Sequence, residues 1–132
     1  DQVIFYEDPL LKTERVLLNA IRYFPNAWKQ FPKAIASQFA DKIWVLDQIS
    51  DRLSIDRKKV SCIPHHLSHA ASSFLFSPFE SSAILTVDGV GEHATTCLWK
   101  GEGTEITLLK TINYPHSIGL LYAAFTAYLG FR

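Results

Sequence analysis

Residues 83–92 read AILTVDGVGE, and the fold depends on this stretch. The unbroken apolar and β-branched run of residues 83–87 predicts a strand that is too buried to be the edge of a sheet. Asp88 ends the strand, and the glycines after it predict an exit turn in which backbone amides can approach a phosphate. A tight hairpin entry with Asp88 capping the turn explains the same residues, so both interpretations stand at this point.

The elements expected around this stretch mix strands with helices. Strands are expected at residues 3–6, 60–63, 83–87, 95–99 and 105–112, and helices at residues 13–24, 35–53, 64–77 and 118–129. The aromatic-rich connector at residues 24–32 is expected to pack onto the core. This order predicts a mixed α/β fold with a seam near residues 77–82.

The composition is that of an ordinary globular chain. Of the 132 residues, 48% are hydrophobic and 20% are charged, which excludes disordered and fibrous classes. Thirteen basic and thirteen acidic side chains cancel, which argues against nucleic acid or an anionic membrane as the main partner. The weakly polar residues 118–131 are fewer than the roughly 20 that a membrane-spanning helix needs.

Three features bear on location and completeness. The sequence does not open with the pattern of a signal peptide, and Cys62 and Cys97 lie far apart in strand-like runs, which favours thiols over a disulfide. A cytoplasmic protein is therefore expected. The chain contains no methionine and begins at once in a strand-like stretch, so we expect an interior piece of a longer protein.

Three histidines within five residues are the most informative chemical feature. On a helix that starts at Pro64, His65 and His69 lie on one face, about a turn apart. A carboxylate from Asp88, at the end of a neighbouring strand, would complete a three-ligand metal site with open positions. A zinc site of Cys62 with the two histidines is an alternative, and solvated or structural histidines are another.

Two further histidines have weaker assignments. His66 points roughly 100° away from His65 on a helix, so it is expected to orient a neighbour or contact substrate rather than bind the metal. His116 lies in a loop that runs into a helix N-terminus, a place that favours anions. It could donate a hydrogen bond or carry a proton there, and a solvated loop histidine explains it equally well.

Read together, several ordered segments closely resemble the O-carbamoyltransferase family, which contains nodulation-factor and antibiotic-tailoring enzymes. The segments are FYEDP (5–9), HHLSHAASSF (65–74), SPFE (77–80), ILTVDGVGE (84–92) and PHSIGLLY (115–122). The resemblance implies part of an actin-like ATPase (ribonuclease H-like) fold, with a mixed sheet and flanking helices. It implies a fragment that straddles two subdomains. Residues 1–78 would end the first subdomain with the His-x-x-x-His helix, and residues 79–132 would begin the second with the phosphate loop.

The same resemblance implies an activity. Such enzymes transfer a carbamoyl group from carbamoyl adenylate, made from carbamoyl phosphate and ATP, to an acceptor hydroxyl. His65, His69 and Asp88 would hold a divalent metal, usually iron, and a further aspartate is expected beyond Arg132. The partners implied are carbamoyl phosphate, ATP, a hydroxyl-bearing small molecule such as a sugar or antibiotic, and the rest of the polypeptide. By itself the chain is expected to be inactive.

One further site assignment follows the family pattern. Gly89, Val90 and Gly91 correspond to the second phosphate loop, which would contact the nucleotide. His66, Glu92 and His116 are candidate substrate contacts, and no catalytic side chain is assigned because the acceptor hydroxyl attacks.

Two other function classes stay open. A metal-dependent hydrolase would use the histidines and Asp88 to activate water, whereas a non-catalytic nucleotide-binding domain of the actin-like class would not need the histidines. Two imidazoles and a carboxylate suit iron, zinc and manganese alike.

Overall fold

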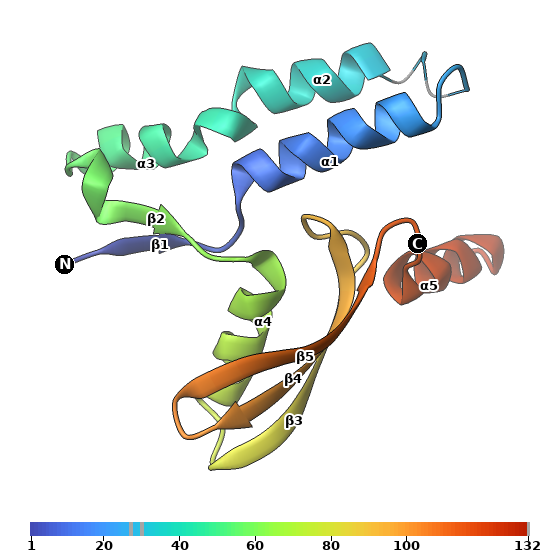
Figure 1. The fold of residues 1–132 in the computed structure, drawn as a ribbon. Coiled ribbons are helices and arrows are strands. Elements are labelled where there is room, and N and C mark those ends of the chain that lie inside the picture. Colours follow the sequence, from blue (N-terminus) through green and yellow to red (C-terminus); the bar gives the residue numbers. More distant parts are fainter. Residues whose placement is uncertain (27, 30, 132) are drawn as a thin grey trace. The chain divides into compact units, whose positions relative to one another are not determined.

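The helix that carries the three histidines belongs to the second of two units into which the chain divides (Figure 1). The computed structural model describes residues 1–26, 28–29 and 31–131. The units are Asp1–Ile63 and Pro64–Arg132. Together their helices and strands confirm the α/β class. The predicted division after residue 78 differs from this one because the histidine helix packs on the strands that follow it. The assignment to two actin-like subdomains stays a prediction.

The first unit is built on a short parallel strand pair. Its elements are β1 (Val3–Phe5), α1 (Pro9–Arg22), α2 (Phe31–Ala40), α3 (Val45–Leu53) and β2 (Val60–Cys62), with single 3₁₀ turns at Lys42–Trp44 and Arg57–Lys59. Val3 pairs with Val60, and Phe5 pairs with Cys62. Because parallel strands need a long crossover connection, the three helices between them are the expected link.

Helix α1 begins four residues earlier than predicted. The Asp8 carboxylate accepts hydrogen bonds from the N–H groups of Leu10 and Leu11, at 2.8 and 3.3 Å, and so caps the helix. Pro9 occupies the first helical position, where a missing N–H costs nothing. The predicted start at Thr13 was wrong because Pro9 was interpreted only as the end of a strand.

The single helix predicted for residues 35–53 is two helices. The backbone leaves the helical region at Asp41, with φ of −136° and ψ of −35°, and a 3₁₀ turn follows before α3 begins. The Gln48 side chain donates to the Asp41 carbonyl at 3.2 Å. Apolar spacing continues through this break, and for that reason periodicity alone did not reveal it.

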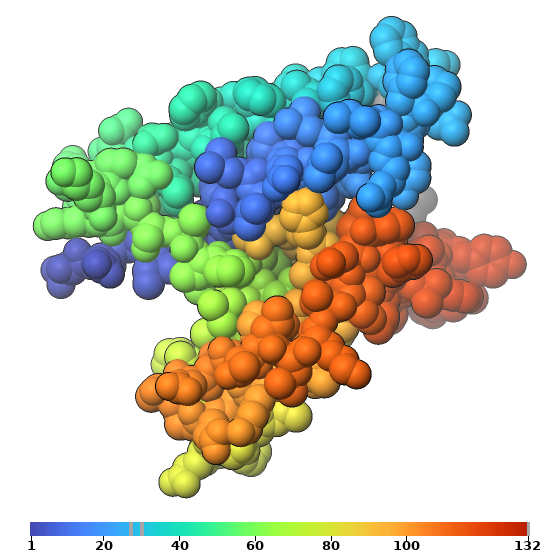
Figure 2. Space-filling model, viewed as in Figure 1, coloured from blue at the N-terminus to red at the C-terminus, as the bar shows by residue number. Residues whose placement is uncertain are grey.

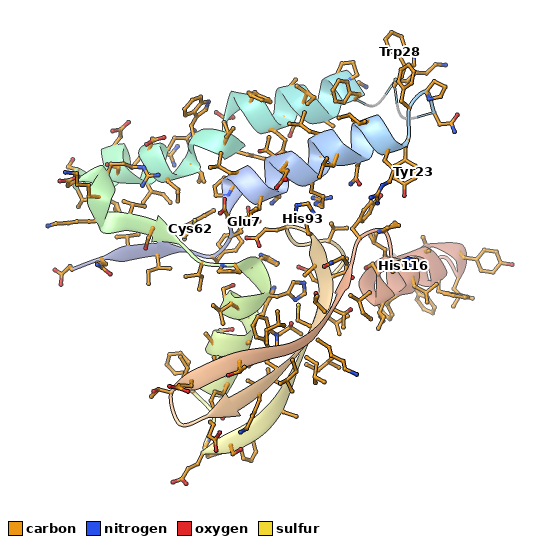
Figure 3. The ribbon with its side chains drawn as sticks, viewed as in Figure 1. Glu7, Tyr23, Trp28, Cys62, His93 and His116 are labelled. Atoms are coloured by element: carbon orange, nitrogen blue, oxygen red, sulfur yellow. The ribbon has the colours of Figure 1, made fainter. Side chains whose placement is uncertain are left out.

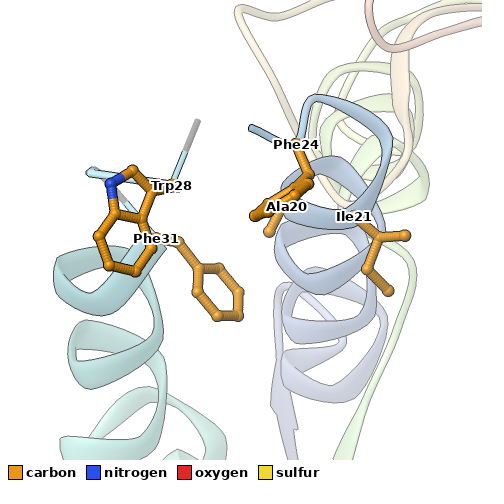
Figure 4. A pocket seen from close by; sticks show the side chains of 5 residues that line it. All are labelled: Ala20, Ile21, Phe24, Trp28 and Phe31. Carbon is orange, nitrogen blue, oxygen red and sulfur yellow. The ribbon is translucent and has the colours of Figure 1, made fainter. Parts of the chain in front are cut away.

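The aromatic connector after α1 lies at the surface, contrary to expectation. Phe24 and Trp28 are exposed, and with Ile21 and Phe31 they line a shallow apolar cavity of about 470 Å³ between the facing ends of α1 and α2 (Figure 4). Positions 27 and 30 of the connector lie outside the described residues.

The second unit places one helix on an antiparallel sheet. Its elements are α4 (His65–Phe74), β3 (Ser81–Val87), β4 (Ala94–Glu102), β5 (Glu105–Asn113) and α5 (Ile118–Tyr128). The strand order is β3-β4-β5. The expected mixed sheet is therefore replaced, in the described residues, by one parallel pair and one antiparallel sheet.

Strand β3 is an edge of this sheet among the described residues, so its predicted central position was wrong. Its side chains alternate: Ile84 and Thr86 are buried, whereas Leu85 and Val87 are 66% and 46% exposed. An antiparallel strand with one covered face shows this pattern even when its sequence is apolar throughout. Figure 2 shows β5, in orange, also at the surface, where Leu108 is exposed.

The core of the second unit lies between α4 and the buried face of the sheet. It consists of Ala70, Phe74, Ile84, Cys97 and Trp99. Because α4 contacts all three strands of the sheet, the core fixes the helix that carries the histidines. In the described part of the chain, no helix has the length and apolar character needed to cross a membrane.

The Gly101→Ala substitution tests how closely α4 and β4 approach. A Cβ at position 101 would lie 2.7 Å from the Phe74 ring, which is rigid and buried. We expect the free energy of unfolding to fall by about 1–3 kcal/mol in urea titrations. Gly103→Asn is the control, because nothing lies within 4 Å of that position and asparagine tolerates its φ of +61°. Equal losses in the two variants would contradict the packing argument.

Candidate metal centre

Three side chains from α4 and the end of β3 converge on one point. His65 and His69 lie four residues apart on α4, as predicted, and Asp88 follows β3 directly. The His65 Nε2 lies 2.6 Å from Asp88 Oδ2, and the two Nε2 atoms are 3.1 Å apart. The His69 Nε2 lies 3.8 Å from the same carboxylate oxygen. The structure therefore brings the three predicted ligands together. Cys62 belongs to the first unit, and the alternative zinc site that includes it stays a prediction.

The donor set fits a divalent cation. Atoms held about 2.1 Å from one ion at tetrahedral or octahedral angles are separated by roughly 3.0–3.4 Å, and the observed separations bracket that range. A proton on His65 Nε2 can form a good hydrogen bond to Asp88 Oδ2 or to His69 Nε2, but not to both. A cation would accept a lone pair from each of the three ligand atoms. The His69 side chain is 52% exposed, so the cluster is open to solvent on that side.

The electrostatics favour an ionised carboxylate at Asp88. Partial burial, the largest single effect, raises its pKa, but hydrogen bonds from His65 and from the Gly89 N–H, together with the charges of the two histidines, outweigh it. The pKa of Asp88 is therefore lowered below its ordinary value. A carboxylate that is already ionised is the form in which aspartate binds a metal.

The start of α5 holds the backbone of Asp88 in place. Ser117 caps α5 by accepting from the Leu120 N–H at 3.0 Å. Its hydroxyl also lies 2.6 Å from the Gly89 carbonyl and 3.2 Å from the Asp88 carbonyl. A Cβ on Gly119 would be only 2.5 Å from the Asp88 carbonyl oxygen. The helix therefore approaches this turn as closely as a glycine permits.

The predicted phosphate loop is partly engaged with the protein itself. The Gly89 N–H donates to the Asp88 carboxylate at 2.6 Å, and the Gly91 N–H donates to the Ala94 carbonyl at 3.2 Å. Gly91 is buried against the imidazoles of His65 and His66. Its lack of a side chain is thus explained by packing, and phosphate contact by Gly89, Val90 and Gly91 stays a prediction.

His66 turns away from the metal ligands, as its helical position indicated, into the interior. Its side chain is buried, with Nδ1 2.8 Å from the Thr86 hydroxyl and Nε2 3.0 Å from the Ala94 carbonyl. Burial, partly opposed by the bond to Ala94, lowers the pKa of His66 below its ordinary value. The predicted substrate contact stays a prediction, and these hydrogen bonds favour instead the alternative that His66 orients its neighbours.

The other two candidate substrate contacts occupy different environments. Glu92 is buried, and its carboxylate accepts the His65 N–H at 3.2 Å, so it stabilises the first turn of α4. His116 is exposed in the loop before α5 (Figure 3), and its carbonyl accepts a 2.6 Å hydrogen bond from the buried Thr95. Substrate contact by either residue stays a prediction.

Sequence reasoning missed Thr86, Trp99 and Gly119 as parts of the site. Thr86 and Trp99 lie beside apolar residues in their strands, so nothing in the sequence indicated a polar role for their side chains. Gly119 gave a usable signal. Glycine destabilises a helix, so its presence in the first turn indicates that another part of the chain approaches closely there.

Comparisons with a family model and with known proteins agree on one family. A family model described as carbamoyltransferase N-terminus matches residues 1–132. The uncharacterized protein sll1178 of Synechocystis sp. is 40% identical over 139 residues, which cover 100% of this chain and 23% of that protein. The nodulation protein NolNO of Sinorhizobium fredii is 47% identical over 77 residues, 58% of this chain and 11% of that protein. The nodulation protein NolO of Bradyrhizobium diazoefficiens is 38% identical over 66 residues, 50% of this chain and 12% of that protein. The chain thus spans under a quarter of the length of these relatives.

The Gly119→Ala substitution tests the contact between α5 and the Asp88 turn. Helix propensity alone predicts a gain of about 0.5–1 kcal/mol, whereas the 2.5 Å approach to the Asp88 carbonyl predicts a loss of roughly 1–3 kcal/mol. Urea unfolding decides between these opposite signs. A stabilised variant would show that the turn can move away freely.

Metal binding is tested by titrating the full-length protein with Co²⁺ and following its absorbance. Asp88→Asn and His69→Ala each remove one ligand and should weaken binding at least 10-fold. Glu105→Gln, which removes an exposed carboxylate at the β4–β5 hairpin, should bind like the wild type. Wild-type affinity in the two ligand variants would exclude this cluster as the metal site.

Proposed function

The chain belongs to the carbamoyltransferase family, and we propose that the protein carrying it is an ATP-dependent O-carbamoyltransferase. The carbamoyl group would come from carbamoyl adenylate, made from carbamoyl phosphate and ATP, and would pass to the hydroxyl of a small molecule such as a sugar or an antibiotic. The protein is proposed to be cytoplasmic, with its elements forming part of an actin-like ATPase fold.

One observation carries the proposal: His65, His69 and Asp88 offer ligand atoms within 4.8 Å of one another in a chain of this family. They lie in one unit, and the open side at His69 leaves space for a further oxygen ligand. The proposed metal is divalent, with iron as the first choice.

In the transfer step, the acceptor oxygen bonds to the carbamoyl carbon while the bond from that carbon to the oxygen of AMP breaks. The hydroxyl proton leaves to solvent or to the departing phosphate. A bound divalent ion would neutralise negative charge on phosphate oxygens. The attacking group belongs to the acceptor, so this chain need not supply a nucleophile.

The residues around the ligands have binding roles in this proposal. Asp88 contributes a fixed negative charge, which its lowered pKa preserves. The N-terminus of α5 lies against the Asp88–Gly89 turn, where its dipole would favour a phosphate. The Gly89, Val90 and Gly91 amides would contact the same phosphate only after exchanging some of their present partners.

The chain covers 23% of sll1178 and 11% of NolNO, so the proposed reaction engages much more polypeptide than the part described. Formation of carbamoyl adenylate, binding of adenine and a further metal ligand are proposed to lie in that other part. The 132-residue chain by itself should then transfer no carbamoyl group.

The test uses the full-length protein with ATP, radiolabelled carbamoyl phosphate and a panel of sugar and aminoglycoside acceptors. The wild type should yield a carbamoylated acceptor and AMP. His69→Ala and Asp88→Asn should lower kcat/KM at least 100-fold, about 2.7 kcal/mol of transition-state stabilisation. Glu105→Gln serves as the matched control and should keep wild-type activity.

Two results would count against the proposal. Undiminished carbamoyl transfer by both ligand variants would exclude the cluster from the reaction. Release of phosphate without a carbamoylated product, lost in the same variants, would indicate a metal-dependent hydrolase instead.

A further inference from the structure

Helix α4 is not capped by its own N-terminal residue. Pro64 precedes the helix and makes no side-chain capping bond. The first turn is instead tied at two points, to the β3–β4 connection and to the start of β4. The His65 N–H donates to Glu92 Oε1, and the His66 ring bonds the Ala94 carbonyl. The position of α4 over the sheet edge therefore depends on the Glu92 carboxylate and the Ala94 carbonyl, both of which lie outside the helix.

The bond to Ala94 determines which nitrogen of His66 carries the proton. A carbonyl oxygen only accepts, so Nε2 must be the donor. In the neutral ring Nδ1 is then an acceptor for the Thr86 hydroxyl at 2.8 Å, a closer acceptor than the Cys97 carbonyl, which lies 3.4 Å from the same hydroxyl. The Thr86 oxygen in turn accepts from Trp99 Nε1 at 3.1 Å. The hydrogen bonds thus run in one direction from Trp99 in β4, through β3 and α4, and back to Ala94 at the start of β4.

This chain of hydrogen bonds runs beside the pair of metal ligands. His66 follows His65 on α4. Thr86 belongs to β3 and lies two residues before Asp88. The His66–Thr86 contact therefore joins α4 to β3 close to the point where His65 and Asp88, the residue after β3, meet at 2.6 Å. A shift of α4 along β3 would break both contacts together.

The β3–β4 connection approaches the rings closely enough to hold them. A Cβ on Gly91 would lie 3.0 Å from Cδ2 of His65 and 3.3 Å from Cδ2 of His66. Both imidazoles thus pack on one backbone segment, and the ring of His66 is almost wholly excluded from solvent. Buried polar groups that are all paired in this way stiffen a site.

We infer that His66 is a positioning residue, which, through the Thr86 hydroxyl and the Ala94 carbonyl, holds His65 against Asp88 before any ion binds. The inference rests on the proposed function only in that the three-ligand cluster is taken to be the metal site. His66 itself contributes no ligand atom.

The experiment compares four variants of the hydrogen-bonded residues, and one control, in the full-length protein. His66→Leu removes both ring hydrogen bonds at similar volume, and His66→Gln keeps an amide donor that can reach Ala94. Thr86→Val removes the hydroxyl, whereas Thr86→Ser keeps it. Each is titrated with Co²⁺, and the visible spectrum of the bound ion reports the geometry of its ligands.

His66→Leu and Thr86→Val should weaken Co²⁺ binding about 10- to 100-fold and alter the spectrum. His66→Gln and Thr86→Ser should recover most of the affinity. Phe74→Leu provides the control for general destabilisation, because Phe74 packs in the core and takes no part in the hydrogen bonds. It should lower the unfolding midpoint without changing the spectrum.

Crystal structures of the metal-free wild type and His66→Leu separate this inference from the proposed function. If the wild type binds no Co²⁺, the metal assignment fails, but a His65–Asp88 contact that lengthens in His66→Leu still supports the positioning role. The inference is overturned if that contact is unchanged, if the wild type binds Co²⁺ and His66→Leu binds it equally well, or if Phe74→Leu alters the spectrum equally.

Discussion

The contact between the Asp88 carboxylate and the His65 imidazole constrains most of the second unit. A partly buried carboxylate is stable only where donors and opposite charge surround it. The surrounding structure meets this condition from three directions: α4 supplies the imidazoles, the Gly89 N–H supplies a backbone donor, and Ser117 at the start of α5 holds the turn. The core beneath α4 then acts as the rigid base for this arrangement.

Polar groups inside that core are paired with one another. Thr86, Trp99 and His66 satisfy one another and a backbone carbonyl, which offsets the cost of burying them. His65 and His69 can consequently present their Nε2 atoms to Asp88 and to an ion. The adjacent His65 and His66 thus meet different partners: His65 contacts Asp88, and His66 is paired in the interior.

Several features of the site could be predicted from spacing because they depend on local geometry. The interval of four between His65 and His69 fixes their common face on any helix, and Ser117 before an apolar run fixes a cap. The position of β3 as an edge strand was not predictable in this way, because a continuous apolar run is compatible with either a central or a one-sided strand. The break at Asp41 was hidden for a similar reason, since apolar periodicity passed through it.

By itself the sequence determined the α/β class, the candidate ligands and the resemblance to carbamoyltransferases, since residue type and short-range order carry that information. Only the tertiary structure decided which groups meet. It placed Gly119 against the Asp88 carbonyl, Gly91 against two imidazoles and Thr86 against His66, pairs separated by 20 or more residues. Such contacts follow from how α4 and α5 dock on the sheet, and docking is set by the packing of many side chains at once.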